Sequence, residues 1–262
     1  MIGDKLSLDV IEHTTLKHLP MIRHAFFTRF GGVSRGRYAS LNSAYKSHDD
    51  SAAVRENRTR ITHYFGKPLE ALVTVNNIHS NQVVVVDEPW LECEKPCADA
   101  IVTKQKGLLL GSDSADCAIV LFADVKAGVV GLAHAGWRGA KCGVLASTVH
   151  AMMQLGAEPC EIVAVIGPCI AQASYEVSAD YYQQFVNDSS DNQRYFKNSQ
   201  QANHFMFDLP AYVADRLVQL GLKSVGQTGI DTYTDERFFS CRRAYHQGED
   251  DFGCHFSCIG LI

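Results

Sequence analysis

Short apolar runs separated by turn residues recur along most of the chain. The runs are rich in Val, Ile and Phe and cover residues 24–30, 72–75, 82–87, 118–125, 128–135 and 162–167. Runs of about four to eight such residues predict β-strands. Because several of them hardly alternate with polar residues, they indicate strands that are buried on both faces.

Longer segments between these runs have the apolar spacing of helices. Each ends at or near a glycine, and together they cover residues 51–66, 139–156 and 209–222. Asp208 precedes the third segment and is a good N-cap. Strands that mix with helices along the whole chain predict an α/β or α+β fold, with a mixed β-sheet packed against helices.

The organisation of the chain predicts one domain. A length of 262 residues with 46% hydrophobic content is enough for a large core. The polar stretch 186–205 is poor in aliphatic residues, but core-like sequence resumes directly after it. We therefore interpret this stretch as a surface excursion rather than a linker, and predict a single domain over residues 1–262.

Charge and composition exclude several classes of partner. The net charge of −5 provides no basic face of the kind that nucleic-acid binding needs. No apolar run approaches the roughly 18 to 20 residues of a membrane span, and the first twenty residues have no secretory signal pattern. Nine cysteines, an odd number, favour reduced thiols. We expect a cytoplasmic protein, monomeric or homodimeric, that binds neither nucleic acid nor membrane.

Candidate chemistry begins with one thiol and two imidazoles beside predicted strands. Cys117 precedes the strand 118–125, and His134 lies near the end of the strand 128–135. If these strands are neighbours, Cys117 and His134 lie near a common sheet edge. His79 occupies the turn between two further predicted strands and is a third candidate.

The same residues have simpler explanations. A lone cysteine before a core strand is often a small buried hydrophobic residue, and a lone histidine in a turn is often solvated or hydrogen-bonded. Separations of 38 and 17 positions between His79, Cys117 and His134 match no short zinc signature. The residues alone leave both interpretations open.

Motifs distributed over nearly the whole chain resemble those of a known family. They are FFTRFGGVSRG (26–36), SLN (40–42), VRENR (54–58), ADA (98–100), SADC (114–117), AHAGWRG (133–139), GPCI (167–170), YEV (175–177) and FFSCRR (238–243). In this order they resemble the YfiH-like family, once called laccase-domain or polyphenol oxidoreductase proteins. AHAGWRG is the most specific of them.

The resemblance implies a metal centre. By motif, His79, Cys117 and His134 correspond to the family's zinc ligands, and copper is the less favoured metal. Thiolate and imidazole are suitable zinc donors, and three protein ligands leave a position for water or substrate. Asp116, directly before the cysteine, is a candidate to transfer a proton, although it could equally cap the turn.

Arginines and aromatic residues complete the candidate site. Arg29, next to a glycine pair, is a candidate catalytic residue, and Arg138 and Arg242 are candidates to bind an anion such as phosphate. Surface salt bridges are the more common role of arginine. Tyr175 and Phe239 could stack on a purine, although aromatic side chains more often belong to the core.

The function implied by the resemblance is phosphorolysis of purine nucleosides. The expected substrates are phosphate with adenosine, inosine or methylthioadenosine, and an adenosine deaminase activity is implied as well. A cysteine hydrolase that acts on a cell-wall precursor peptide, with Cys117 as nucleophile, is an alternative. A copper-dependent polyphenol oxidase is a weaker one, because the eleven histidines include no H-x-H pair.

Two positions depart from the family pattern. Asn77 replaces the usual glutamine two residues before the first metal histidine, and its shorter amide reaches less far. Cys254 stands where the family usually has an arginine, so we expect weaker binding of anions. A second metal site formed by Cys93, Cys97, Cys254 and Cys258 has no counterpart in the family, and we interpret these residues as reduced thiols.

Overall fold

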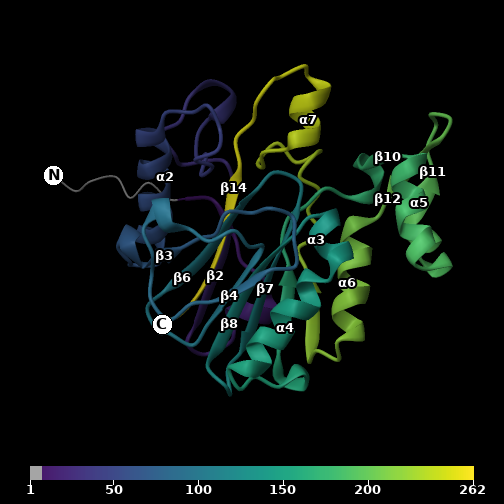
Figure 1. Ribbon diagram of the computed structural model, residues 1–262. Coiled ribbons are helices and arrows are strands. Elements are labelled where there is room, and N and C mark those ends of the chain that lie inside the picture. Colours follow the sequence, from purple (N-terminus) through teal and green to yellow (C-terminus); the bar gives the residue numbers. More distant parts are fainter. Residues whose placement is uncertain (1–7) are drawn as a thin grey trace.

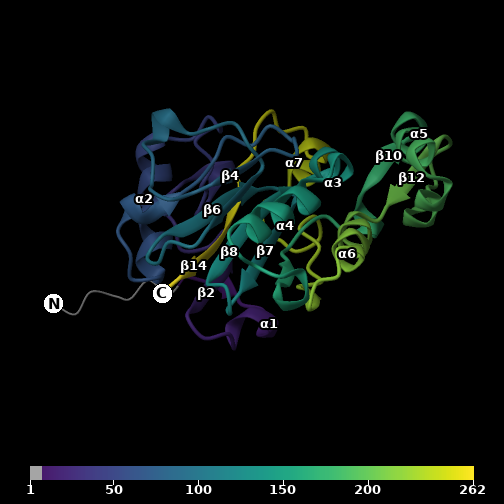
Figure 2. The same ribbon diagram turned by 60° about the horizontal axis from the view of Figure 1, so that its bottom comes forward.

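The computed structural model of the protein describes residues 8–262, so the first seven residues of the predicted domain lie outside it. Two large sheets lie face to face between helices, and a small third sheet stands at one edge (Figures 1 and 2). This confirms the expected mixture of α and β structure, although the strands divide into three sheets rather than one.

The strand orders define the three sheets. The five-stranded sheet runs β1 (Val10–Ile11), β2 (Ile22–Phe27), β14 (His255–Leu261), β6 (Leu109–Ser114), β3 (Leu72–Val73). The six-stranded sheet runs β13 (Ser224–Gln227), β9 (Val163–Ile166), β7 (Ala118–Asp124), β8 (Val129–Ala135), β5 (Ala100–Thr103), β4 (Val83–Val85). The three-stranded sheet runs β10 (Glu176–Ser178), β12 (His204–Phe207), β11 (Phe196–Asn198).

Within residues 8–262, seven α-helices flank the sheets. They are α1 (Thr14–Lys17), α2 (Ser51–Tyr64), α3 (Trp137–Cys142), α4 (Val144–Gln154), α5 (Ala179–Asp188), α6 (Leu209–Gln219) and α7 (Cys241–His246). Helix α2 covers the five-stranded sheet, while α4 and α6 lie on the far side of the six-stranded sheet (Figure 1). Between the two sheets lies an apolar layer that includes Phe26, Leu121 and Ile259.

Helix ends follow the predicted capping in most places. The Asp208 carboxylate accepts a hydrogen bond from the backbone N–H of Ala211, as expected of an N-cap. The segment 139–156, however, is not one helix. Gly143 has a φ of 93°, a left-handed conformation that ends α3 and begins α4. The glycine therefore creates two short helices with different directions.

Residues 176–208 form an arm at the edge of the molecule, beyond α6 in both views (Figures 1 and 2). The arm consists mainly of the three-stranded sheet and α5, so the polar stretch 186–205 is a surface excursion that carries secondary structure of its own. Tyr181, Phe185 and Phe207 pack inside it, and the Trp137 ring of α3 lies 4.6 Å from the Tyr181 ring. This aromatic cluster fixes the arm against α3.

No helix within residues 8–262 has the length and apolar character needed to cross a membrane.

Candidate metal centre and its cavity

Three side chains of the kind that bind metals meet at one edge of the six-stranded sheet. The nitrogen and sulfur atoms of His79, Cys117 and His134 all lie within 4.8 Å of one another. The rings of the two histidines are 4.9 Å apart and tilted. Among the described residues, no other group of three or more His, Cys or acidic side chains has the spacing of a metal site.

Strand register explains why two of the three residues meet. β7 and β8 are antiparallel, and Ile119 on β7 lies directly opposite His134 on β8. Cys117, just before β7 begins, therefore lies at the same sheet edge as the end of β8. The structure brings Cys117 and His134 together as the apolar runs predicted.

Hydrogen bonds from the backbone of its turn hold His79 in place. Its φ is 58°, an uncommon value for a residue other than glycine. The N–H groups of Ile78, His79 and Ser80 all donate hydrogen bonds to the carboxylate of Asp99, at 3.3, 2.9 and 2.5 Å. This buried carboxylate thus fixes the turn that carries His79.

Asp99 also orients the buried histidine. Nδ1 of His134 lies 3.0 Å from Oδ1 of Asp99, so that Nδ1–H donates and Nε2 is left for a metal. Burial raises the pKa of Asp99, but hydrogen bonds from His134 and Ser80 outweigh it and lower the pKa to about 2. Burial lowers the pKa of His134, but Cys117 and Asp99 outweigh it and raise the pKa to about 10, so a metal that binds Nε2 must displace its proton. Asp99 was not identified from the sequence.

A glycine leaves room beside the sulfur and nitrogen atoms. A Cβ atom on Gly136 would lie 2.8 Å from Sγ of Cys117 and 3.0 Å from Nδ1 of His79. Two imidazoles and a thiol that converge on a space kept open by glycine, with a carboxylate behind one imidazole, fit a zinc ion. The three residues could therefore hold the implied metal.

A cavity of about 820 Å³ opens beside these atoms. Its walls include most of the residues proposed from the sequence: His79, Asp116, Cys117, Arg138, Tyr175 and Arg242. His134 lies behind this wall, with only 4% of its surface exposed. Further lining residues come from the arm and from the end of α7, which the sequence did not indicate.

Asp116 connects the cysteine turn to α7. It is buried, has a φ of 88°, and accepts hydrogen bonds from Thr232 Oγ1 and the Arg242 N–H, both at 2.7 Å. Burial raises the pKa of Asp116 above its ordinary value, although these hydrogen bonds oppose the shift. The contacts give Asp116 a structural role, while its proposed part in proton transfer remains a prediction.

Both candidate anion-binding arginines pack on aromatic rings. The guanidinium of Arg242 lies 5.3 Å from the centre of the Tyr175 ring, and its Nη1 donates to the Glu176 carbonyl at 2.8 Å. The guanidinium of Arg138 lies 4.7 Å from the Trp137 ring. Aromatic packing holds both groups in the wall of the cavity and leaves several N–H donors for a ligand.

The structure does not bring Arg29 and Phe239 to this cavity. They line a separate hollow of about 70 Å³, where the Arg29 guanidinium lies 4.3 Å from the Phe239 ring. Nε of Arg29 donates to the Ala39 carbonyl at 2.6 Å, and Phe239 is 3% exposed. In this arrangement Arg29 organises a loop through backbone carbonyls rather than forming the surface salt bridge considered for it. Phe239 belongs to the core, the alternative that the sequence left open.

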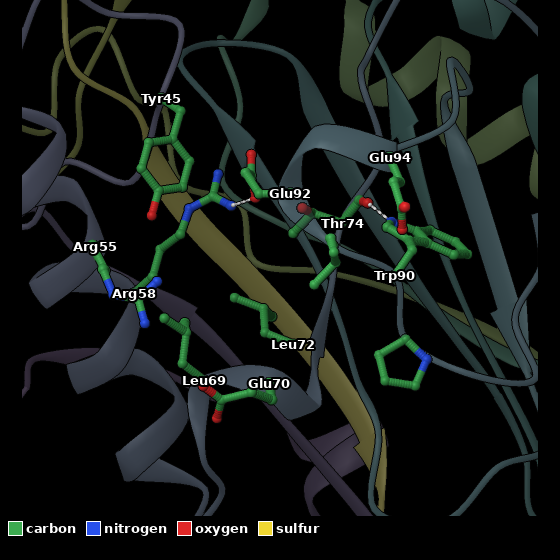
Figure 3. A pocket seen from close by; sticks show the side chains of 12 residues that line it. Tyr45, Arg55, Arg58, Leu69, Glu70, Leu72, Thr74, Trp90, Glu92 and Glu94 are labelled. Atoms are coloured by element: carbon green, nitrogen blue, oxygen red, sulfur yellow. Dashed lines mark hydrogen bonds and ion pairs between the residues drawn. The ribbon is translucent and has the colours of Figure 1, made fainter.

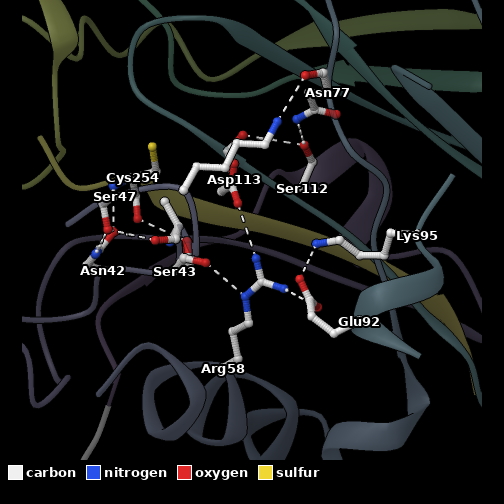
Figure 4. A network of polar contacts seen from close by, with 12 residues as sticks. Asn42, Ser43, Ser47, Arg58, Asn77, Glu92, Lys95, Ser112, Asp113 and Cys254 are labelled. Carbon is white, nitrogen blue, oxygen red and sulfur yellow. Dashed lines mark hydrogen bonds and ion pairs between the residues drawn. The ribbon is translucent and has the colours of Figure 1, made fainter. Parts of the chain in front are cut away.

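Asn77 and Cys254 belong to one polar network (Figure 4). The Asn77 amide donates to Ser112 Oγ at 3.0 Å, which connects the His79 loop to β6 despite the shorter side chain. The N–H of Cys254 donates to the Asn42 side chain at 2.9 Å. Burial raises the pKa of the Cys254 thiol well above its ordinary value, so the thiol is uncharged.

Other candidate features lie apart from the metal centre. A cavity of about 420 Å³ lies beside Arg58, Tyr45 and Trp90 and shares no lining residue with the larger one (Figure 3). Cys258 is buried in β14, whereas Cys93 and Cys97 are exposed. The structure therefore gives no support to a second metal site that includes these cysteines.

Known proteins resemble this chain over most of its length. Residues 23–262 match the model of the family described as multi-copper polyphenol oxidoreductase laccase. A purine nucleoside phosphorylase of Rickettsia prowazekii is 39% identical over 226 residues, covering 86% of this chain and 90% of that protein. One of Deinococcus radiodurans is 42% identical over 180 residues, covering 65% and 68%.

Solved structures agree with these sequence matches. The Neisseria meningitidis protein NMB0706 superposes with a TM-score of 0.85 at 31% identity, covering 97% of this chain and 98% of that one. The Bacillus licheniformis protein YfiH gives a TM-score of 0.85 at 26% identity, with 99% and 98% covered. This chain belongs to the multi-copper polyphenol oxidoreductase laccase family, whose solved members include YfiH.

Proposed function

We propose that the protein is a zinc-dependent purine nucleoside phosphorylase that acts on adenosine, inosine and methylthioadenosine. The observation that carries the proposal is the position of His79, Cys117 and His134 at one end of a cavity that also presents two arginines. The relatives named purine nucleoside phosphorylase support the same reaction.

The residues of the cavity suit the two substrates. The guanidiniums of Arg138 and Arg242 can hold a phosphate anion, and their aromatic neighbours keep them oriented. Phosphorolysis breaks the C1′–N9 bond of the nucleoside, forms a bond from C1′ to a phosphate oxygen, and releases the base with a proton. We assign the exchange of that proton to Asp116, which precedes Cys117 and whose pKa is raised by burial.

His79, Cys117 and His134 would hold the zinc, and Asp99 would fix their orientation. Zinc with three protein ligands supplies a Lewis acid and acidifies bound water. We propose adenosine deamination at the same site, in which water replaces the amino group on C6 and ammonia leaves. All nine cysteines are free thiols, which supports the proposed cytoplasmic location.

The test is chromatography of the products of purified protein incubated with inosine, with and without phosphate. Phosphate-dependent release of hypoxanthine and ribose 1-phosphate is expected. Arg138→Ala should raise the KM for phosphate about tenfold or more, because a charged hydrogen bond is lost. Arg35→Ala, at an exposed arginine away from the cavity, is the matched control. Absence of turnover, or release of free ribose regardless of phosphate, would contradict the proposal.

One observation favours a second candidate, a cysteine hydrolase that acts on a cell-wall precursor peptide. Cys117, His134 and Asp99 also have the order of nucleophile, base and orienting carboxylate. Metal content separates the two, since a thiolate bound to zinc is a poor free nucleophile. Copper-dependent oxidation of phenols is disfavoured, because residues 8–262 offer a single group with metal-site spacing.

A further inference from the structure

The cavity has an outer rim that the proposed chemistry does not use. Its lining continues past the arginines to Ser178, Gln201 and His204 on the arm, and to Tyr245 and His246 on α7. We infer that this rim, formed by the arm and the end of α7, binds the purine base and determines which nucleosides are accepted. The inference rests on the proposed function and adds a base-binding subsite to it.

Two elements lead from the metal centre to the rim. On α7, the backbone of Arg242 lies close to the metal centre, because its N–H donates a hydrogen bond to Asp116, the neighbour of Cys117. Tyr245 and His246 follow at i+3 and i+4, so they share its helix face and lie about 5 Å further along. The helix therefore presents a cation at its inner end and an aromatic pair at its outer end.

The arm supplies the second wall of the cavity. Tyr175, under the Arg242 guanidinium, leads into β10, and Ser178 at the end of that strand is three residues further, about 10 Å away. Ser178 pairs directly with His204 on β12, and both line the cavity. Arg242 links the two walls through its hydrogen bond to the Glu176 carbonyl. The rim thus lies beyond the arginines, on both sides of the opening.

The rim side chains have the chemistry of base recognition. Tyr245 is 75% exposed and offers a ring face on which a purine can stack. Nδ1 of His204 lies 3.0 Å from the Ala202 carbonyl, which can only accept, so the neutral ring presents Nε2 as an acceptor. Gln201 adds an amide that can both donate and accept. The donor and acceptor edge of a purine matches this set.

The positive charge of the cavity indicates where the phosphate and the sugar of the nucleoside bind. Arg138 and Arg242 are the cations of this cavity, and they lie at the inner end with the metal donors. Phosphate and the reacting C1′ atom belong there, because phosphorolysis joins them. In phosphorolysis the base on the other side of C1′ is then directed outward, toward Tyr245 and His204. The proposed deamination needs a second orientation of the nucleoside, with C6 of the base at the metal centre.

The experiment compares Tyr245→Ala and His204→Ala with the wild-type protein. Both residues lie at the opening rather than in the core, and His150→Ala on the exposed face of α4 is the matched control. We expect the KM for inosine to rise about tenfold in each rim variant, with kcat and the KM for phosphate unchanged. Calorimetric titration with hypoxanthine should show a similar loss of affinity, because hypoxanthine is the base alone, the part of inosine that the rim contacts.

Other outcomes overturn the inference. Unchanged KM and unchanged hypoxanthine affinity in both variants would remove the rim from recognition, and weaker inosine binding with normal hypoxanthine binding would assign it to the sugar. Wild-type protein that binds hypoxanthine without phosphorolysis would refute the proposed function alone, provided the variants lose that binding. Wild-type protein that binds neither compound would refute both.

Discussion

The carboxylate of Asp99 organises two of the three candidate metal ligands at once. It accepts a hydrogen bond from Nδ1 of His134 at 3.0 Å and from the N–H of His79 at 2.9 Å. One fully buried acid, directly before β5, therefore connects a ligand on β8 with a ligand on a separate loop. Its loss should affect the metal centre more than the fold around it.

Asp99→Asn keeps the shape of the side chain but removes its charge. We expect zinc affinity to fall about 10- to 100-fold, because an amide holds the His134 ring less firmly and in either orientation. Competition with a chromophoric chelator measures the change. Asp87→Asn, at an exposed position, is the control and should leave the affinity unaltered. Equal zinc affinity in Asp99→Asn and wild type would contradict the role of Asp99.

Gly136→Ala tests whether space for the metal depends on the missing side chain. The added Cβ would lie 2.8 Å from Sγ of Cys117, so Sγ or His79 must move. We expect a loss of zinc affinity of about tenfold or more, while the cost to helix α3 stays near 1 kcal/mol. Elemental analysis together with thermal unfolding separates the two effects. A variant that retains full zinc content would show that the glycine is not needed.

Gly143 should contribute to stability through its backbone conformation. Nothing lies within 4 Å of a Cβ built there, so Gly143→Ala would add strain from its φ of 93° without a steric clash. The expected loss is about 1 to 2 kcal/mol in the free energy of unfolding. Gly143→Asn should lose less, since asparagine tolerates the left-handed region. Denaturant unfolding measures both, and equal stability of Gly143→Ala and wild type would refute the argument.

Buried His24 should make stability depend on pH. Burial lowers its pKa to about 4, below the ordinary value of about 6.5. Between these values the unfolded chain binds the proton more readily. The contribution of His24 to the free energy of unfolding is therefore complete above pH 6.5. It decreases by about 1.4 kcal/mol per pH unit as the pH falls toward 4. His24→Asn should flatten this slope in unfolding experiments with chelator present, whereas His150→Asn should not. An unchanged slope in His24→Asn would contradict the prediction.

Local patterns in the sequence predicted part of the site and missed the rest. Cys117 and His134 were found because each lies beside an apolar run long enough to be a strand, and neighbouring antiparallel strands share an edge. Asp99 was missed because one acid before a strand looks the same as a turn residue. The ADA motif at residues 98–100, with an acid between small apolar residues, was the feature of the sequence that could have indicated Asp99.

Long-range strand pairing accounts for the parts of the fold that the sequence did not predict. β14, at the end of the chain, pairs with β2 near its start and with β6 between them, which no local window can indicate. The polar composition of the arm concealed its short strands, whose apolar residues pack on one another and on Trp137. Tyr245 comes from α7 and His204 from the arm, so their place in one cavity depends on tertiary structure.

The most direct test of the metal centre is the metal content of protein purified without added metal, measured by mass spectrometry beside Cys117→Ala. The account predicts about one zinc per wild-type chain, and a loss of both zinc and phosphorolysis in the variant. A wild-type protein without metal, whose Cys117 is rapidly alkylated by a thiol reagent, would contradict it and favour the cysteine hydrolase.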